Sequence, residues 1–413
     1  MTAETTAAES RSRDMAIIVT AGGIVLALAF GVRAVFGGVV QPLSDDLFGG
    51  RIEIFSLSLA IQNLVWGLAQ PGFGMIADRY GDRPALWLGF VCYAAGMGVC
   101  ILGTTPLAQH LGAGVLVGMG ISGTAFGTVL AVVGRVAPPD KRGFYLGVVS
   151  AMGSAGQALL PLLVSWLIAW FDWRMTLLIV TALLAPMALC IPFLRAGGQG
   201  VAEDDPVELG QTIRAAFGHT SFLMLSAGFF VCGFHLAFIT AHLPNFVQNF
   251  CTGTTLSPEE LRGLGLRALA LAGFANIFGT LYASRLGGQF PKPYVLAAIY
   301  ALRAVVILGF ISFPITPSSV LMFGFLMGGL WLSTVPLTSA LVLGMFGPRA
   351  MGTLFGFVFL SHQLGSFAGA WLGGVWFDRT GSYDMVWYVA IVLGLASAAI
   401  HLMVQERPAP VLT

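Results

Sequence analysis

The sequence contains few charged residues for its size. Of 413 residues, 9% are charged and 57% hydrophobic, and the mean hydropathy is +0.85. A soluble protein of this length carries charge at about a quarter of its positions, so we predict an integral membrane protein in contact with the lipid bilayer. The net charge of +1 leaves no basic surface for phosphate contacts, which excludes a nucleic-acid-binding protein.

Acidic residues are missing from the long apolar stretches. All 19 Asp and Glu residues fall in predicted loops, at the ends of apolar runs or in the N-terminal tail. Arg33 and Arg303 nevertheless lie inside apolar runs. A guanidinium stays protonated in a protein and is costly at membrane depth. We therefore expect the missing anionic partner of Arg33 to arrive as substrate.

Signatures of enzymes and of bound cofactors are also missing. The five cysteines are scattered, which predicts small buried side chains and neither disulfides nor a metal site. No nucleotide-binding G-x-x-x-x-G-K-[ST] loop occurs, which excludes an ATP-driven pump. No nucleophile–base–acid set can be assembled in the apolar core, so we predict no enzyme, no cofactor and no metal.

Twelve apolar runs are long enough to cross a membrane as helices, which takes about 20 residues each. The longest polar interruption, near residues 196–217, divides them into two sets of six. The predicted runs are 15–41, 53–76, 85–103, 106–134, 142–169, 174–195, 218–247, 264–287, 293–314, 317–346, 351–377 and 384–405. The predicted domains are a cytoplasmic tail at 1–14, a six-helix half at 15–195, a cytoplasmic linker at 196–217, a second half at 218–405 and a tail at 406–413.

The two halves resemble copies of each other. A shift of 209 positions superposes Gly147 on Gly356 and Gly156 on Gly365. Repeated halves of this kind hold a substrate near the bilayer midplane at the repeat interface. The fold class predicted is therefore an all-α membrane protein with two pseudo-symmetric six-helix halves.

The distribution of Lys and Arg predicts the orientation, because cytoplasmic loops carry the excess of positive charge. Placing both termini in the cytoplasm leaves five basic residues outside and two in the membrane, Arg33 and Arg303. The cytoplasmic side then holds Arg11, Arg13, Arg79, Arg83, Arg135, Lys141, Arg142, Arg195, Arg214, Arg285, Lys292, Arg349 and Arg407.

The segment from Gly74 to Arg83, GMIADRYGDR, joins the second and third runs. It resembles the loop signature G-x-x-x-D-R-x-G-x-R of the major facilitator superfamily at every signature position. We predict that Asp78 meets cationic groups at the ends of neighbouring helices and latches the cytoplasmic side. Gly74 permits close backbone approach and Gly81 a tight turn. The remaining predicted latch and gate residues are Arg79, Arg83, His242 and Pro244.

Two further stretches resemble the bacterial monocarboxylate-porter and oxalate/formate-antiporter branch of that superfamily. One is Gly31–Gly37 followed by Gln62–Gly67; the other is Gly352–Gly365 with the segment DRTGSY at 378–383. The resemblance implies alternating-access transport of a small organic anion. The chain departs from the branch because its eighth run contains no acid and His362–Gln363 replaces a lysine in the eleventh. The proton could instead be carried by a histidine.

Arg33 is predicted to clamp a substrate carboxylate; the alternatives are outward snorkelling or binding to free carbonyls. Arg303 is a weaker candidate, since it could face Tyr300 or carbonyls across a helix pair. For the other polar residues, the alternative to substrate contact is hydrogen bonding between helices or, for the histidines, to backbone carbonyls. These further substrate-binding candidates are Gln62, Asn63, Trp66, Gln157, His235, Asn276, His362, Gln363 and Ser366.

The sequence thus predicts a secondary transporter of a small organic anion, most simply a monocarboxylate, in a bacterial cytoplasmic membrane. Transport would be coupled to protons or proceed by anion exchange, and the functional unit would be a monomer. The alternative is efflux of a neutral or cationic amphiphile, which commonly relies on a membrane-embedded acid that this chain lacks.

Overall fold

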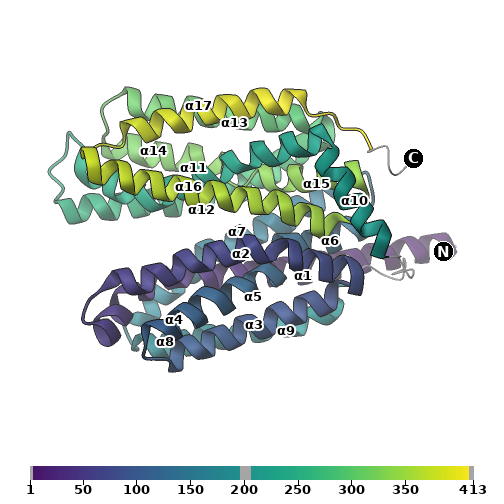
Figure 1. Ribbon diagram of the computed structural model, residues 1–413, viewed down its shortest axis with the longest axis horizontal. Helices are drawn as coiled ribbons and strands as arrows, with labels where there is room; N and C mark the ends of the chain where they lie inside the picture. The colour runs from purple at the N-terminus through teal and green to yellow at the C-terminus, as the bar shows by residue number, and fades with distance from the viewer. Residues whose placement is uncertain (1–2, 196–205, 409–413) are drawn as a thin grey trace. The chain divides into compact units, whose positions relative to one another are not determined.

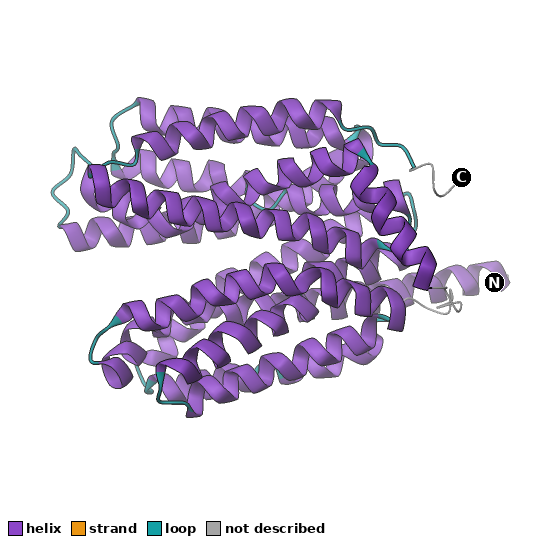
Figure 2. Cartoon of the chain, viewed as in Figure 1, coloured by secondary structure: helices purple, strands orange, loops and turns teal. Residues whose placement is uncertain are grey.

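The computed structural model describes residues 3–195 and 206–408, and all regular secondary structure in these ranges is helical (Figure 2). The chain forms two compact units. Unit 1 comprises Met1–Ile213 and Phe346–Gly356, and unit 2 comprises Arg214–Met345 and Phe357–Thr413. The segment 346–356 therefore belongs to unit 1 although most of its sequence neighbours belong to unit 2.

In the described residues, unit 1 contains six long helical segments. Their α-helices are labelled in Figure 1. The fourth and sixth segments are interrupted, so each carries several labels. In chain order the elements are α1 (Ala3–Phe48), α2 (Ile52–Tyr80), α3 (Asp82–Leu102), α4 (Pro106–Gln109), η1 (His110–Leu116), α5 (Val117–Thr124), α6 (Phe126–Val136), α7 (Arg142–Ile168), α8 (Trp173–Ala182), α9 (Ala185–Cys190) and η2 (Ile191–Phe193). Helix α10 (Pro206–Gly218) lies in the predicted linker.

Unit 2 also contains six long segments, of which the fourth is broken. In order they are α11 (Thr220–Phe250), α12 (Pro258–Gln289), α13 (Lys292–Ser312), α14 (Pro317–Leu330) with α15 (Thr334–Phe346), α16 (Met351–Thr380) and α17 (Asp384–Met403). The first turns of α16, up to Gly356, are part of unit 1.

Length and hydropathy identify ten of these segments as able to cross a membrane. The other two, α2 and α16, have 29 and 30 residues and match the second and eleventh predicted runs. Many large apolar side chains on the segments are exposed, as expected of surfaces that face lipid; Leu68 is 59% and Phe278 60% exposed. The predicted all-helical membrane fold is confirmed.

Local sequence accounts for several helix ends. Ser257 caps α12 and Glu260 completes a capping box, while Thr316 and Ser319 do the same for α14. These side chains satisfy N–H groups that have no partner within the helix. At the end of α2, Gly81 adopts φ +93°, a conformation that side chains with a Cβ rarely adopt.

Equivalent features recur in the two units at the predicted repeat spacing. Gly156 on α7 lies against the backbone of Ala27 on α1, and Gly365 on α16 lies against the backbone of Phe230 on α11. A Cβ at either glycine would collide with a carbonyl oxygen. The fourth segment is broken in both units, at Ala125 in unit 1 and at residues 331–333 in unit 2. These breaks bring backbone carbonyls within reach of side chains from other helices.

Candidate functional site

Arg33 lies on α1 and is held by two side chains from α2. Its Nη2 donates to Asn63 Oδ1 at 2.5 Å, and its guanidinium carbon lies 5.0 Å from the centre of the Trp66 ring. Its Nε is buried without a hydrogen-bond acceptor. Among the residues whose side chains the structure describes, no carboxylate forms an ion pair with Arg33. The positive charge is therefore held in place but not neutralised.

The partners of Arg33 are fixed by a hydrogen-bond network beside the break in the fourth segment. Trp66 Nε1 donates to Gln70 Oε1 at 3.1 Å, and Gln70 Nε2 donates to the Ser122 carbonyl at 3.0 Å. Ser122 Oγ in turn donates to the Trp66 carbonyl at 3.0 Å. This closed set of bonds joins α2 to α5 three residues before the break at Ala125, so the ring beneath the guanidinium has a defined position.

Further aromatic side chains pack around Trp66 and the adjoining part of α1. Phe30, one turn earlier on α1, lies 5.7 Å from Trp66 and 4.7 Å from Phe126, measured between ring centres. Tyr93 on α3 is fully buried, and its hydroxyl donates to the Ala29 carbonyl at 2.7 Å. A guanidinium in such surroundings keeps its full charge and can offer two parallel N–H groups to a carboxylate.

Two other predicted contact residues of unit 1 have different surroundings. Gln62 is buried, and its Nε2 donates to the Ala113 carbonyl at 2.7 Å, which ties α2 to η1. This is the interhelical bonding expected as the alternative to substrate contact. Gln157 is exposed on α7.

Arg303, the second arginine within an apolar run, is capped by backbone carbonyls. It is only 1% exposed; its Nε donates to the Leu330 carbonyl at 3.0 Å, and its Nη2 donates to the carbonyls of Leu330 and Trp331. The guanidinium carbon lies 5.2 Å from the centre of the Tyr300 ring. Arg303 thus closes the end of α14 at the break in the fourth segment of unit 2.

Asn276 serves the same break from α12. Its Oδ1 accepts a hydrogen bond from the Leu332 amide at 2.8 Å, inside the non-helical turn. The sequence predicts that Asn276 contacts substrate. In the structure its side chain accepts from a backbone N–H that has no acceptor within the broken helix. His235 on α11 is likewise bonded to backbone, with its Nε2 2.8 Å from the Ala390 carbonyl. These bonds are of the kind given above as the alternative, and contact of either residue with substrate stays a prediction.

The predicted residues of α16 lie together on one stretch of helix. His362 Nδ1 is 3.2 Å from Gln363 Oε1, and Ser366 Oγ donates to the His362 carbonyl at 3.1 Å. The His362 ring stacks on Phe359, with ring centres 5.2 Å apart. The helix thus presents a small polar group within otherwise aromatic surroundings.

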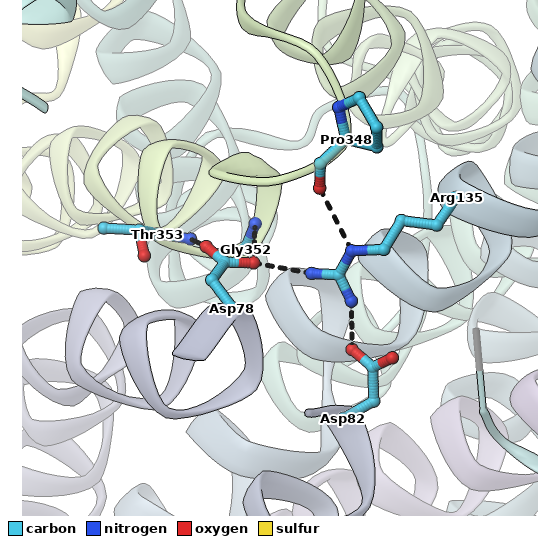
Figure 3. A network of polar contacts seen from close by, with 6 residues as sticks. All are labelled: Asp78, Asp82, Arg135, Pro348, Gly352 and Thr353. Atoms are coloured by element: carbon cyan, nitrogen blue, oxygen red, sulfur yellow. Dashed lines mark hydrogen bonds and ion pairs between the residues drawn. The ribbon is translucent and has the colours of Figure 1, made fainter. Parts of the chain in front are cut away.

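The predicted latch is a buried ionic network in unit 1 (Figure 3). Asp78 Oδ1 accepts from Arg135 Nη2 at 2.5 Å, and Arg135 also donates to Asp82. The same Asp78 carboxylate accepts from the amides of Gly352, at 3.1 Å, and Thr353, at 2.7 Å. Asp78 therefore neutralises a cation and also satisfies the N-terminus of α16, where the helix dipole favours negative charge.

The other latch residues surround this network. A Cβ on Gly74 would collide with the Gly352 carbonyl, so the approach of α2 to the start of α16 requires glycine. Arg79 is exposed and lies over the Tyr80 ring at 5.2 Å, and Arg83 donates to the Pro192 carbonyl. Sequence reasoning did not identify Arg135 or Asp82 as members. The signal available was Arg135 itself, a basic residue in the last turn of α6.

His242 and Pro244 lie near the C-terminal end of α11. His242 Nε2 is 2.8 Å from the Ala370 carbonyl of α16. Pro244 has no amide hydrogen, so the Thr240 carbonyl loses its partner within the helix and the helix can bend there. Over the ranges that the structure describes, no group of three or more His, Cys, Asp or Glu residues could hold a metal ion.

Known proteins resemble this chain over most of its length. It is 26% identical to the uncharacterized MFS-type transporter YcxA of Bacillus subtilis, over 90% of each chain. It is also 26% identical to monocarboxylate transporter 13 of Bos taurus, over 91% of this chain and 85% of the relative. A multi-drug resistance efflux pump PmrA homolog of Lactococcus lactis is 22% identical over 79% of each chain.

A solved structure and a family profile agree with these relatives. The crystal structure of the E. coli fucose:proton symporter FucP superposes with a TM-score of 0.72, covering 95% of this chain and 98% of FucP at 13% identity. The profile of the Major Facilitator Superfamily matches residues 22–257, which is more than half of the 413 residues. The resemblance noted in the loop after the second run is thereby confirmed, and the chain belongs to the major facilitator superfamily of membrane transporters.

Proposed function

We propose that this protein transports a small organic anion, a monocarboxylate, by alternating access, and that Arg33 binds the carboxylate. The observation that carries this proposal is the state of Arg33: a cation on a spanning helix with a buried Nε that lacks an acceptor and no ion-pair partner among the described side chains. Arg303 does not have this property, because carbonyl oxygens occupy its Nε and Nη2.

The surroundings of Arg33 favour an anion with an apolar body. Trp66 supplies aromatic surface next to the guanidinium, Phe30 packs against Trp66, and Phe126 packs against Phe30. Asn63 and Trp66 hold the side chain before substrate arrives, so less conformational entropy is lost on binding. A carboxylate that pairs with Arg33 also makes the site easier to desolvate, since a paired charge costs less to bury than a bare one. That difference would favour closure of the loaded carrier over the empty one.

The names of two relatives bear on the substrate. Monocarboxylate transporter 13 supports a carboxylate, whereas the PmrA homolog supports efflux of a drug-like compound. We favour the carboxylate because an unneutralised arginine repels cationic amphiphiles, while exporters of the alternative class commonly rely on an acid in the membrane. We propose a bacterial cytoplasmic membrane, with both termini in the cytoplasm and a monomer as the transporting unit.

A ligand screen on the purified protein tests this proposal. A ligand that binds only the folded state raises the melting temperature. We expect monocarboxylates to raise it and amines of similar size to leave it unchanged. Stabilisation by amphiphilic amines without any response to carboxylates would instead support the efflux alternative.

Coupling is tested separately in proteoliposomes. Counterflow of a responding carboxylate is compared with and without an imposed pH gradient. Net uptake that is driven by the gradient indicates proton symport, and counterflow that is independent of pH with no net uptake indicates anion exchange.

A further inference from the structure

One polar cluster of unit 2 has no part in the carboxylate site proposed above. It lies where the C-terminal part of α11 meets α16 and the segment that precedes α17. His242 Nε2 is 2.8 Å from the Ala370 carbonyl, and Tyr383 Oη is 3.3 Å from His242 Nδ1. Asn245, three residues after His242, donates from Nδ2 to Tyr383 Oη at 2.8 Å. Tyr383 ends the segment DRTGSY, to which no role has yet been given.

The hydrogen-bond partners within this cluster define where its protons lie. A carbonyl can only accept, so the bond to Ala370 requires a proton on His242 Nε2. The Asn245 amide donates to the Tyr383 oxygen, which leaves the hydroxyl hydrogen free to donate to Nδ1. Burial raises the pKa of the Tyr383 hydroxyl, so that hydrogen is retained. The imidazole is therefore neutral in this arrangement, and its basic nitrogen, Nδ1, accepts from the Tyr383 hydroxyl.

One acidic residue of α16 acts on this pair through its charge. Asp378, near the end of α16, acts electrostatically on both His242 and Tyr383 and is itself exposed to solvent. Two other elements pack against this part of α11. The segment before α17 contributes Tyr383 as its titratable group, and α12 contributes Gly265, which faces Pro244 and does not titrate. Within the described part of the chain, Asp378 is the charged group whose field acts on the imidazole. Asp378 follows Phe377, whose ring stacks on Tyr383, so an exposed carboxylate adjoins this cluster in the chain and offers a path for protons from water.

The fold leaves a fitted space for the imidazole ring. A Cβ on Gly373 of α16 would collide with His242 Cδ2 and Nε2. The Tyr383 ring is 99% buried and stacks on Phe377, with ring centres 4.6 Å apart. The Ala370 carbonyl at Nε2 and the Tyr383 hydroxyl oxygen at Nδ1 therefore have fixed positions. Protonation of Nδ1 then requires the Tyr383 hydroxyl hydrogen to turn away.

We propose that His242, Tyr383 and Asp378 form a proton-binding site at this end of unit 2, and that a proton bound there is the one coupled to transport. The coupling to transport rests on the proposed function, whereas the proton-binding site does not. His242 Nδ1 takes a proton from hydronium and releases water, which gives an imidazolium in the field of the Asp378 carboxylate. The Tyr383 hydroxyl can then no longer donate to Nδ1 and must rotate to accept from it. Proton binding thus rearranges the contact that joins α11 to the start of α17.

The site can be tested without any substrate. The chain has six histidines, so ¹⁵N-histidine-labelled protein in detergent micelles gives a resolvable imidazole spectrum, and His242→Gln identifies the His242 signals. We expect the Nε2-protonated tautomer at high pH and conversion to imidazolium between about pH 5 and 8, the range in which histidine changes charge. Asp378→Asn should move the midpoint toward acid, because a stabilising charge is lost. Tyr383→Phe should move it toward alkali, because a bond to the neutral form is lost.

Matched substitutions control for general effects. Asp384→Asn and Tyr388→Phe make the same chemical changes on α17 and should leave the midpoint within about 0.2 pH units, below the shift of about half a unit expected for the loss of an exposed charge. Folding of each variant is checked by its melting temperature. A His242 that stays neutral down to pH 5, or a midpoint that does not respond to Asp378→Asn, would overturn the proposal. Failure of the carboxylate proposal would leave this spectrum unchanged, so the two failures are distinguishable.

Discussion

Arg33 and Arg303 are the same residue type in equally apolar stretches, yet the two regions treat the charge differently. In unit 1 the guanidinium is held by the side chains of Asn63 and Trp66 and keeps a buried Nε without an acceptor. In unit 2 the guanidinium donates to the carbonyls of Leu330 and Trp331, which a helix break has released. Under the proposed function the first cation binds a substrate anion, whereas backbone oxygens already bind the second.

The difference teaches that an arginine in a membrane helix is not by itself evidence of a substrate site. A broken helix leaves carbonyl oxygens without amide partners, and a buried arginine can donate hydrogen bonds to them without any part in substrate binding. Unit 1 has a break at the corresponding place, but there neutral groups do this work: Gln70 binds the Ser122 carbonyl. Arg33 is thereby left available for another role.

Replacement of Arg33 gives the largest expected effect on binding. Removal of one member of a buried charge pair costs about 2–5 kcal/mol, so Arg33→Gln should weaken carboxylate binding by about thirtyfold or more. Because no bond to backbone is lost, its melting temperature without ligand should stay near that of the wild type. Affinity is measured by titration calorimetry and stability by thermal unfolding in detergent.

The same change at Arg303 should act on stability instead. Arg303→Gln leaves buried carbonyls short of donors, at a cost of about 1–3 kcal/mol for each unsatisfied group. We therefore expect a lower melting temperature. Carboxylate affinity should stay within about threefold of the wild type, which is less than about 1 kcal/mol, because Arg303 binds backbone carbonyls and not the substrate. A stable Arg303→Gln protein that has lost carboxylate binding would reverse the comparison between the two regions.

Asn63→Asp converts the Arg33 region into one in which the cation is already paired. The new carboxylate would lie where Asn63 Oδ1 now accepts from Arg33 at 2.5 Å. Substrate must then compete with an internal anion, so we expect about ten- to hundredfold weaker carboxylate binding, from a charge-assisted bond worth about 1.5–3 kcal/mol. Asn63→Leu, which removes the amide without adding charge, is the control and should have the smaller effect on affinity.

Lysine substitutions should give the smallest effects, and these sharpen the comparison. Arg33→Lys keeps the charge but loses the planar fork, so carboxylate affinity should fall by about tenfold. Arg303→Lys should still cap one carbonyl and lower stability by about 1 kcal/mol. Equal affinity for carboxylate in Arg33→Lys and the wild type would indicate a point-charge contact and not a bidentate clamp.

Much of the fold could be predicted from sequence because membrane segments follow simple rules of length and hydropathy. All twelve runs correspond to helical segments, and Gly156 and Gly365, which lie at the repeat spacing, are at close helix contacts. The breaks at Ala125 and at residues 331–333 could not be predicted. Neither site contains proline, and a break in a buried helix depends on polar partners supplied by distant helices, such as Asn276, whose Oδ1 accepts from the Leu332 amide.

The candidate sites were predictable to a smaller extent. The rarity of charge pointed to Arg33, and the loop signature pointed to Asp78. The partners could not be predicted, because Arg135 is 57 residues from Asp78 and Tyr383 is 141 residues from His242. Nor could sequence decide whether Arg303 meets substrate or backbone, since that depends on a helix break that leaves no local pattern.

The most direct test of the central claim compares a carboxylate with its own neutral amide. The stabilising monocarboxylate from the ligand screen and the corresponding primary amide are titrated against wild type, Arg33→Gln and Arg303→Gln. The amide keeps the shape of the acid but cannot pair with a cation. We predict that wild type and Arg303→Gln bind the acid at least tenfold more tightly than the amide, whereas Arg33→Gln binds both weakly and about equally. Full preference for the acid in Arg33→Gln would contradict the claim that this guanidinium holds the carboxylate.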